Sequence, residues 1–274
     1  MTKGEHALAA LVESAESVFR PEAPESFWDC RAAFQTFVDS SFLRDEINRQ
    51  LIQQRDRPDF VGSWFSREWV LHRERFLLSV SLHEEPQRYI HALPTLAFYA
   101  LLSGESVDYD VYRLPDSYRN DVFDPSLHLE PVESRRLQCG EVLSIESDRF
   151  VYDFRFRQPT LLLKLVTPPI RTLEWLFSRD RLQAWQANDA DLSFTQLRVA
   201  ATVLGRFAHH SSIDPVEKLT KHPHHAVRWA AIQNLARLYR LAAIQALEAA
   251  THDRHPHVQS AARKALQAIT DKKI

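Results

Sequence analysis

The side chains best suited to chemistry are histidines that gather in two turns near the C-terminus. They are His222, His224, His225, His252, His255 and His257. Two or more imidazoles aimed at one point could hold a metal ion. Polar residues in the turn before a helix more often cap and solvate its first turn. We therefore predict no metal site and no cofactor here.

Arginines form the second group of candidates. Residues 179–274 hold 14 Lys/Arg against 8 Asp/Glu, a net charge of +6, whereas residues 1–178 carry a net charge of −8. A basic surface can bind an acidic protein or nucleic-acid phosphates, although scattered surface charges would give the same count. The candidates for a partner surface are Arg228, Arg237, Arg240 and Arg263.

Short apolar strands separated by turn residues occupy the middle of the chain. They cover residues 76–82, 96–102, 109–114, 141–145, 149–157 and 160–167, and a hairpin is expected over 172–186. Strands this short at this spacing predict an antiparallel sandwich or barrel.

The glycine spacing in this region resembles the two motifs of the cupin family. Gly104 takes the last glycine of the first motif, and Gly140 takes the first glycine of the second. The run 161–169 is similar to the last strand of cysteine-dioxygenase-like cupins. The resemblance covers about residues 72–178. It implies a cupin-like antiparallel β-barrel.

The metal ligands of that family are largely missing from the matching positions. Those four positions fall on His91, Leu93, Ala97 and Val151. A catalytic transition metal needs about three protein ligands that converge on one point, so His91 alone cannot hold one. His83 or His128 would have to complete a site, and nothing in their spacing argues for it. We predict a metal-less barrel and assign no catalytic residue.

The strand 149–157 gives two conflicting indications of which side chains face the barrel interior. Alternation places four aromatic residues on one face, whereas the motif count turns Val151 and Arg155 inward. A slip of one residue exchanges the faces, and a row of aromatic rings is costly to expose. We therefore expect the aromatic residues inside, where they form a closed core, with a ligand pocket as the alternative. The candidates for the barrel interior are His91, Phe98, Phe150, Tyr152 and Phe154.

Residues 1–70 carry apolar side chains at steps of three and four, which predicts helices packed on the barrel. Two cysteines do not make a disulfide framework. The N-terminus lacks the pattern of a signal peptide, and no apolar run approaches the length of a membrane span. We expect a cytoplasmic protein that does not bind membranes.

The C-terminal region contains an internal repeat. Val227, Ala230, Ala231 and Leu235 recur at an offset of 31 residues as Val258, Ala261, Ala262 and Leu266. Residues 211–270 resemble HEAT repeats, which implies protein recognition. Two repeats are too few to stand alone, so a helix starting at a capping box of Ser193 and Gln196, together with the barrel, must cover one end.

The sequence thus predicts an α+β fold with three parts: a helical lead-in over 1–70, a cupin-like barrel over 71–188 and a HEAT-like helical domain over 189–274. The function expected first is a non-enzymatic interaction or scaffold protein with a protein partner. The alternatives are nucleic-acid binding through the basic C-terminal domain and an atypical cupin enzyme. The resemblance to cupins also allows a homodimer through barrel strands.

Overall fold

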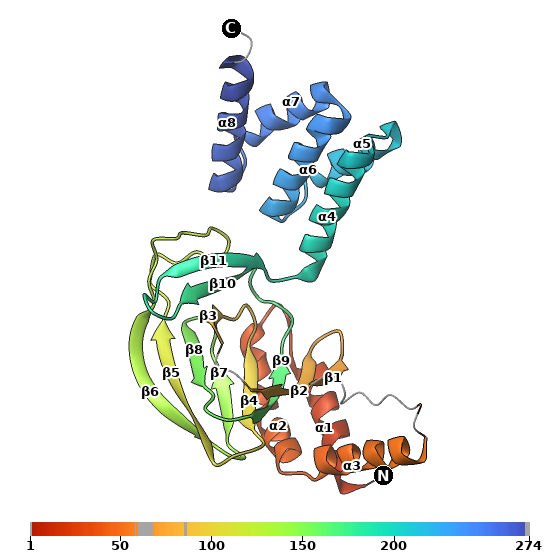
Figure 1. Ribbon diagram of the computed structural model, residues 1–274, viewed down its shortest axis with the longest axis vertical. Coiled ribbons are helices and arrows are strands. Elements are labelled where there is room, and N and C mark those ends of the chain that lie inside the picture. Colours follow the sequence, from red (N-terminus) through yellow and green to blue (C-terminus); the bar gives the residue numbers. More distant parts are fainter. Residues whose placement is uncertain (1, 58, 60–67, 85–86, 272–274) are drawn as a thin grey trace. The chain divides into compact units, whose positions relative to one another are not determined.

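The computed structural model of the chain describes residues 2–57, 59, 68–84 and 87–271. They form two compact units, described separately below (Figure 1). The β unit consists of the chain up to Tyr118 and of Asp124–Ala187, and the helical unit consists of Arg119–Phe123 and the chain from Asn188 onward. The helical lead-in is part of the β unit, and the end of the predicted lead-in at residues 60–67 lies outside the described residues. No sequence pattern marks Arg119–Phe123.

Helices cover one side of the β unit. They are α1 (Lys3–Val18), the 3-10 helix η1 (Pro24–Cys30), α2 (Arg31–Val38) and α3 (Phe42–Asp56). A capping box opens α1, because the Thr2 hydroxyl accepts from the Glu5 N–H (3.2 Å) and Glu5 accepts from the Thr2 N–H (2.7 Å). The fully buried side chains of Leu11, Phe34 and Phe37 belong to the apolar cluster between these helices and the sheet.

Three antiparallel sheets make up the rest of this unit. Their strands are β1 (Glu68–His72), β2 (Leu77–His83), β3 (Tyr89–Ala92), β4 (Ala97–Leu101), β5 (Ser106–Arg113), β6 (Glu130–Gln138), β7 (Val142–Ile145), β8 (Phe150–Arg155), β9 (Thr160–Val166), β10 (Leu173–Ser178) and β11 (Ala184–Asp189). The strand orders are β1-β2-β9-β4-β7, β11-β10-β3 and β6-β5-β8. The two motif glycines, Gly104 and Gly140, have φ angles of +79° and +81°, which favour glycine because it lacks a Cβ.

Strand β4 separates the helical layer from the interior of the β unit. Ala97, Tyr99 and Leu101 face the interior cluster, whereas Phe98 lies on the other face. There its ring stacks on those of Phe27 (4.9 Å between centroids) and Phe34 (5.7 Å). The placement of Phe98 in the barrel interior is therefore wrong. This strand is apolar on both faces, so its sequence does not tell which one turns inward.

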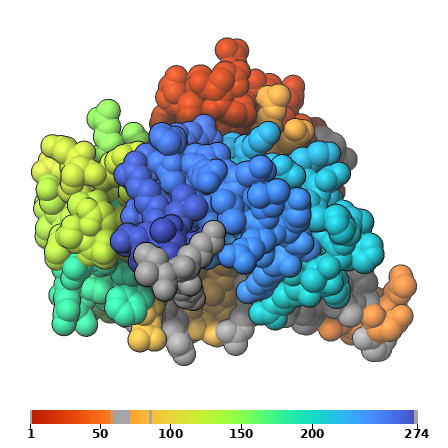
Figure 2. Space-filling view, turned by 90° about the horizontal axis from the view of Figure 1, so that it is seen from above, coloured from red at the N-terminus to blue at the C-terminus, as the bar shows by residue number. Residues whose placement is uncertain are grey.

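The helical unit, cyan to blue in Figure 2, contains five α-helices in its described part. They are α4 (Leu192–Phe207), α5 (Ile213–Leu219), α6 (His225–Leu238), α7 (Arg240–Ala250) and α8 (Pro256–Asp271), with the 3-10 turn η3 (His210–Ser212) before α5. The carboxylate of Asp191 caps α4 by accepting from the Ser193 N–H (2.8 Å), so Asp191 replaces the predicted cap Ser193. No helix in the described residues is long and apolar enough to cross a membrane.

The repeated residues form the contacts between these helices. Val227 of α6 and Val258 of α8 are buried, as are Ala231 and Ala262. Helix α4 approaches α6 closely at Gly205, where an added Cβ would lie 2.7 Å from the Cβ of Asn234. Small residues at these positions allow the helices to approach each other closely.

Candidate functional sites: the β-unit cavity and the histidine-rich turns

The interior of the β unit contains a cavity of about 270 Å³. Its walls come from β2, β3, β4, β7, β8, β9 and β10. The interior is therefore hollow, and the closed core expected from the sequence is wrong. The volume lies just below the usual range of small-molecule sites, about 300–1,000 Å³.

Aromatic rings form one side of the cavity. Tyr152, Phe154 and Phe156 line it from β8 and the residue after it, and Tyr99 lines it from β4. The rings of Phe154 and Phe156 lie nearly parallel, 5.9 Å apart, and run along the wall instead of filling the space. Two of the candidates for the barrel interior, Tyr152 and Phe154, therefore line the cavity. Phe150 packs against the interior apolar cluster of the β unit, which contains Ala97, Tyr99 and Leu101.

Polar side chains face the same cavity, among them His83, His91, Lys164 and Glu174. A hydrogen bond of 2.8 Å joins the Nδ1 atom of His91 to the Oε1 atom of Glu174. The Lys164 ammonium lies 5.6 Å from the centre of the Tyr99 ring. His83 stacks on Phe156 at 4.7 Å, and its Nε2 is 3.0 Å from the Ser81 hydroxyl. The cavity therefore combines an apolar wall with hydrogen-bonding and charged groups.

Burial controls the protonation of this site. It lowers the pKa of His83 to about 4, and the charge of Lys164 acts in the same direction. It also raises the pKa of Tyr99, with the Glu174 carboxylate as the second cause. At neutral pH, His83 and Tyr99 are thus uncharged and available for hydrogen bonding.

The positions that match the cupin ligands do not converge on an ion. The His91 ring is hydrogen-bonded to Glu174, Leu93 lines the cavity, and Val151 is buried on β8. His128 is exposed, and its Nδ1 bonds to the Ser126 carbonyl. Across the described residues, no three His, Cys, Asp or Glu side chains are grouped so that they could hold a metal ion.

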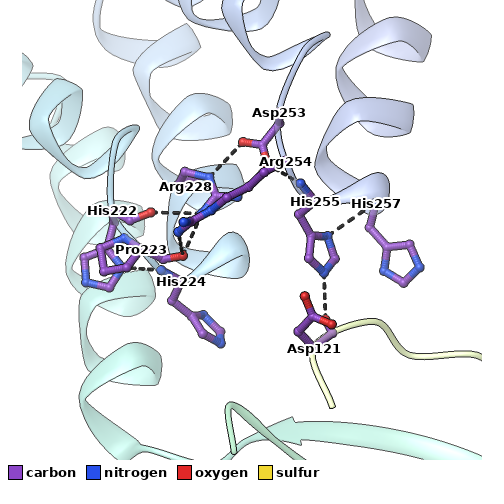
Figure 3. A network of polar contacts seen from close by, with 9 residues as sticks. All are labelled: Asp121, His222, Pro223, His224, Arg228, Asp253, Arg254, His255 and His257. Atoms are coloured by element: carbon purple, nitrogen blue, oxygen red, sulfur yellow. Dashed lines mark hydrogen bonds and ion pairs between the residues drawn. The ribbon is translucent and has the colours of Figure 1, made fainter. Parts of the chain in front are cut away.

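The second candidate site is a polar network between the two histidine-rich turns of the helical unit (Figure 3). At its centre Arg228 donates through Nε and Nη2 to both carboxylate oxygens of Asp253, at 2.8 and 2.5 Å. Its Nη1 also donates to the carbonyls of His222 (2.9 Å) and Pro223 (2.8 Å). Arg228 is 6% exposed. Its prediction as a partner-surface residue is wrong, because its guanidinium ties adjacent turns together.

A stack of rings lies beside this network. Phe194, His224, His225 and His255 follow one another, with centroid separations of 4.2, 4.8 and 3.7 Å. The Nε2–H of His255 donates to the carbonyl of Asp121 (2.7 Å), and its Nδ1 accepts from the His257 N–H (3.3 Å). A neutral ring with its proton on Nε2 satisfies both bonds.

Each buried histidine of the stack is held in its neutral form. Burial, followed by the nearby His255, lowers the pKa of His225 to about 3. Burial also lowers the pKa of His224 and of His255. Neither ring nitrogen of His224 has a hydrogen-bond partner within the described part of the chain, and its Nε2 lies 3.9 Å from Asp189. These histidines therefore pack as aromatic rings.

The other partner-surface candidates have exposed side chains. Arg237 donates to Asn234 at 3.4 Å, and Arg263 donates to the carbonyl of Thr251 at 3.3 Å. Arg240 opens α7 and is also exposed. All three can reach a partner, whereas Arg228 cannot.

The helical unit is HEAT-like, since residues 187–267 match the family described as HEAT repeats. No curated protein matches the chain. The α+β fold class is confirmed, with N-terminal helices, antiparallel sheets and C-terminal HEAT-like helices in the predicted order.

Solved structures similar to the chain include cupin-superfamily proteins. One is a cupin superfamily protein from Desulfitobacterium hafniense, with 12% identity over 39% of this chain and 83% of that one, at a TM-score of 0.24. Another is a cupin-superfamily sugar phosphate isomerase from Silicibacter pomeroyi, with 12% identity, 48% and 83% coverage and a TM-score of 0.25. A third is hydroquinone 1,2-dioxygenase from Sphingomonas sp. TTNP3, with 12% identity over 34% of this chain and a TM-score of 0.27. The chain spans only 24% of that dioxygenase.

Proposed function

We propose that this protein is a non-enzymatic recognition protein, in which a metal-less β unit carries a HEAT-like helical unit that binds a protein partner. The match of residues 187–267 to HEAT repeats carries this proposal. The exposed arginines Arg237, Arg240 and Arg263 are the residues we propose for contact with an acidic partner.

Site-specific photocrosslinking tests the proposal. A photoreactive amino acid is placed in the full chain at Arg237, Arg240 or Arg263, and at the exposed Glu133 of β6 as the control. We expect one discrete protein adduct from the helical positions and none from Glu133. Adducts from Glu133 alone would contradict the proposal.

Nucleic-acid binding is the alternative for the same surface. Because Arg228 is buried, it cannot supply a positive charge to this surface. The remaining candidates are Arg237, Arg240 and Arg263. Titration of a generic duplex at two salt concentrations separates the two ideas, since phosphate contacts give a steep salt dependence. Salt-dependent binding lost on replacing all three arginines would favour nucleic acid. Absence of binding at low salt would favour a protein partner.

The cavity of the β unit favours a second function, which is binding of a small aromatic molecule that carries an anionic or acceptor group. The apolar wall of Tyr152 and Phe154 would hold the ring, and Lys164 would meet the polar group. A thermal-shift screen of aromatic carboxylates and phenols tests this. Lys164→Met should abolish the stabilisation by the best compound, whereas Arg157→Met, also on the β unit but 80% exposed, should preserve it.

A further inference from the structure

Helix α4 of the helical unit has two faces of different character. Its packed face contains Ala201, which is fully buried, and Gly205, whose backbone lies against Asn234 of α6. The opposite face contains four large apolar residues that no other described helix of the helical unit covers. They are Leu192, Val199, Val203 and Phe207, which are 69%, 56%, 42% and 73% exposed.

The four exposed side chains form one stripe. An α-helix turns by about 100° per residue, so these positions fall within an arc of about 80° and extend over about 22 Å. Single exposed apolar residues are ordinary, but four on one helix face mark an interaction surface, in which the exposed Gln196 is the polar member of the same arc. Neither apolar cluster of the helical unit includes any of the four residues.

The charge around the stripe is of one sign. Between Asp191 and Asp214 the chain contains no acidic residue, but it contains Arg198, Arg206 and two histidines. Arg206 is exposed and falls about 20° outside the edge of the stripe in helical projection. Arg198 is paired with Asp189 at 2.6 Å, which leaves Arg206 as the cation beside the apolar residues.

We infer that the exposed face of α4 binds an amphipathic helix with acidic residues along its apolar side. Such a helix would extend the layer in which α4 packs on α6, and its carboxylates would meet Arg206. A second copy of this chain fits less well, because its own α4 is free of acidic residues and would bring a second Arg206 to the interface. This inference rests on the proposed protein-recognition function and names the surface and the partner.

The test uses two fluorescent peptides of about 18 residues, long enough to form a helix. Both carry leucines at steps of three and four, one with flanking glutamates and the other with flanking lysines. Titrated with the full chain, the glutamate peptide should bind about tenfold more tightly or better, a difference of about 1.4 kcal/mol. Equal binding of the two peptides, or no binding of the glutamate peptide, would overturn the inference.

Two variants locate the surface. Val199→Ser with Val203→Ser should weaken binding of the glutamate peptide about tenfold, since each loses buried apolar area while Ser and Val have similar helix propensities. Leu241→Ser, which changes an apolar residue 55% exposed on α7, should leave the affinity unchanged. Binding that survives the double change would overturn the inference. So would a dimer, seen by sedimentation, that the double change dissociates.

The inference and the proposed function can fail separately. If the crosslinked partner is still bound by the Val199→Ser, Val203→Ser variant but is lost when Arg237, Arg240 and Arg263 are replaced, the α4 surface is wrong and the function stands. If no position on the helical unit gives a protein adduct, the proposed function fails.

Discussion

The imidazole rings of His225 and His255 lie face to face, 3.7 Å apart between centroids and within 1° of parallel. One residue opens α6 and the other precedes α8, so the stack joins two repeats. Two positive rings would repel strongly at this distance. The contact is therefore incompatible with a positive charge on both rings.

The stability of the helical unit should fall in acid. The pKa of His225 in the folded protein, about 3, lies below the unfolded value of about 6.5, so the unfolded chain takes up its proton first. The contribution of the neutral His225 ring to the free energy of unfolding is complete above about pH 6.5. It is lost as the pH falls toward 3. Thermal melts should show a Tm lower by about 5 °C or more at pH 4.5 than at pH 7.5.

Two matched variants test whether the stack of His225 on His255 causes this acid sensitivity. His225→Phe keeps a stacking ring that cannot be protonated, so it should reduce the Tm difference between the two pH values. His252→Gln changes an exposed histidine and should leave that difference unchanged. Equal Tm differences in wild type and His225→Phe would show that the stack does not control the response.

Loss of the Arg228 guanidinium should destabilise the helical unit strongly. Arg228→Met leaves the carboxylate of Asp253 without its partner, which we expect to cost about 3–5 kcal/mol in urea denaturation. Arg237→Met makes the same change on the exposed side of the same helix and should cost less than about 0.5 kcal/mol. Similar losses for the two variants would contradict the structural role of Arg228.

Phe98→Ala should destabilise the β unit by about 3–5 kcal/mol, because it empties a fully buried site against Phe27 and Phe34. Phe207→Ala, at a position 73% exposed, should change the free energy of unfolding by less than about 0.5 kcal/mol. Chemical denaturation measures both. A small effect of Phe98→Ala would mean that the helices do not pack on β4 as described.

Gly205→Ala should be destabilising despite the better helix propensity of alanine. The new Cβ would lie 2.7 Å from the Asn234 Cβ, so α4 and α6 must separate, at a cost of about 1–3 kcal/mol. Truncation of Asn234 to Gly should recover part of this loss in the double variant. Full additivity of the two changes would show that the helices do not meet there.

Elemental analysis of the purified, untagged protein should find no stoichiometric iron, nickel or manganese. The reason is that only His91 remains at the four positions that match the cupin ligands. About one metal ion per chain that is lost on His91→Ala would contradict this expectation.

Segments with a periodic pattern of apolar residues could be predicted from the sequence. Segments whose structure depends on contacts with residues far away in the sequence could not. The repeat from Val227 to Leu266 and the inward turn of Tyr152 and Phe154 follow from apolar periodicity. Strand β6 could not be predicted, because it is a charged and mostly exposed edge strand. Its Arg136 pairs with Asp108 of β5 at 2.7 Å, a contact between residues 28 positions apart.

The candidate sites show the same limit. Arg228 was indistinguishable from the exposed arginines in sequence, because its burial depends on Asp253, which lies 25 positions further along the chain. The cavity escaped prediction because alternation tells which face the rings of β8 occupy but not whether they meet across the interior. The signal that could have indicated it is the pair of inward polar residues, Lys164 and Glu174, on two strands of mostly apolar sequence.

The division of the chain between its two units passes through three points of the backbone: after Tyr118, after Phe123 and after Ala187. A single cut by a protease therefore cannot release either unit with all of its own parts. Truncation after Asn188 would leave Arg119–Phe123 without His255, whose ring donates a hydrogen bond to the carbonyl of Asp121. A gene fusion at one end could therefore not add or remove the whole helical unit, because Arg119–Phe123 lies inside the sequence of the β unit. We expect a related chain without the helices to differ also in the β5–β6 connection, which contains Arg119–Phe123.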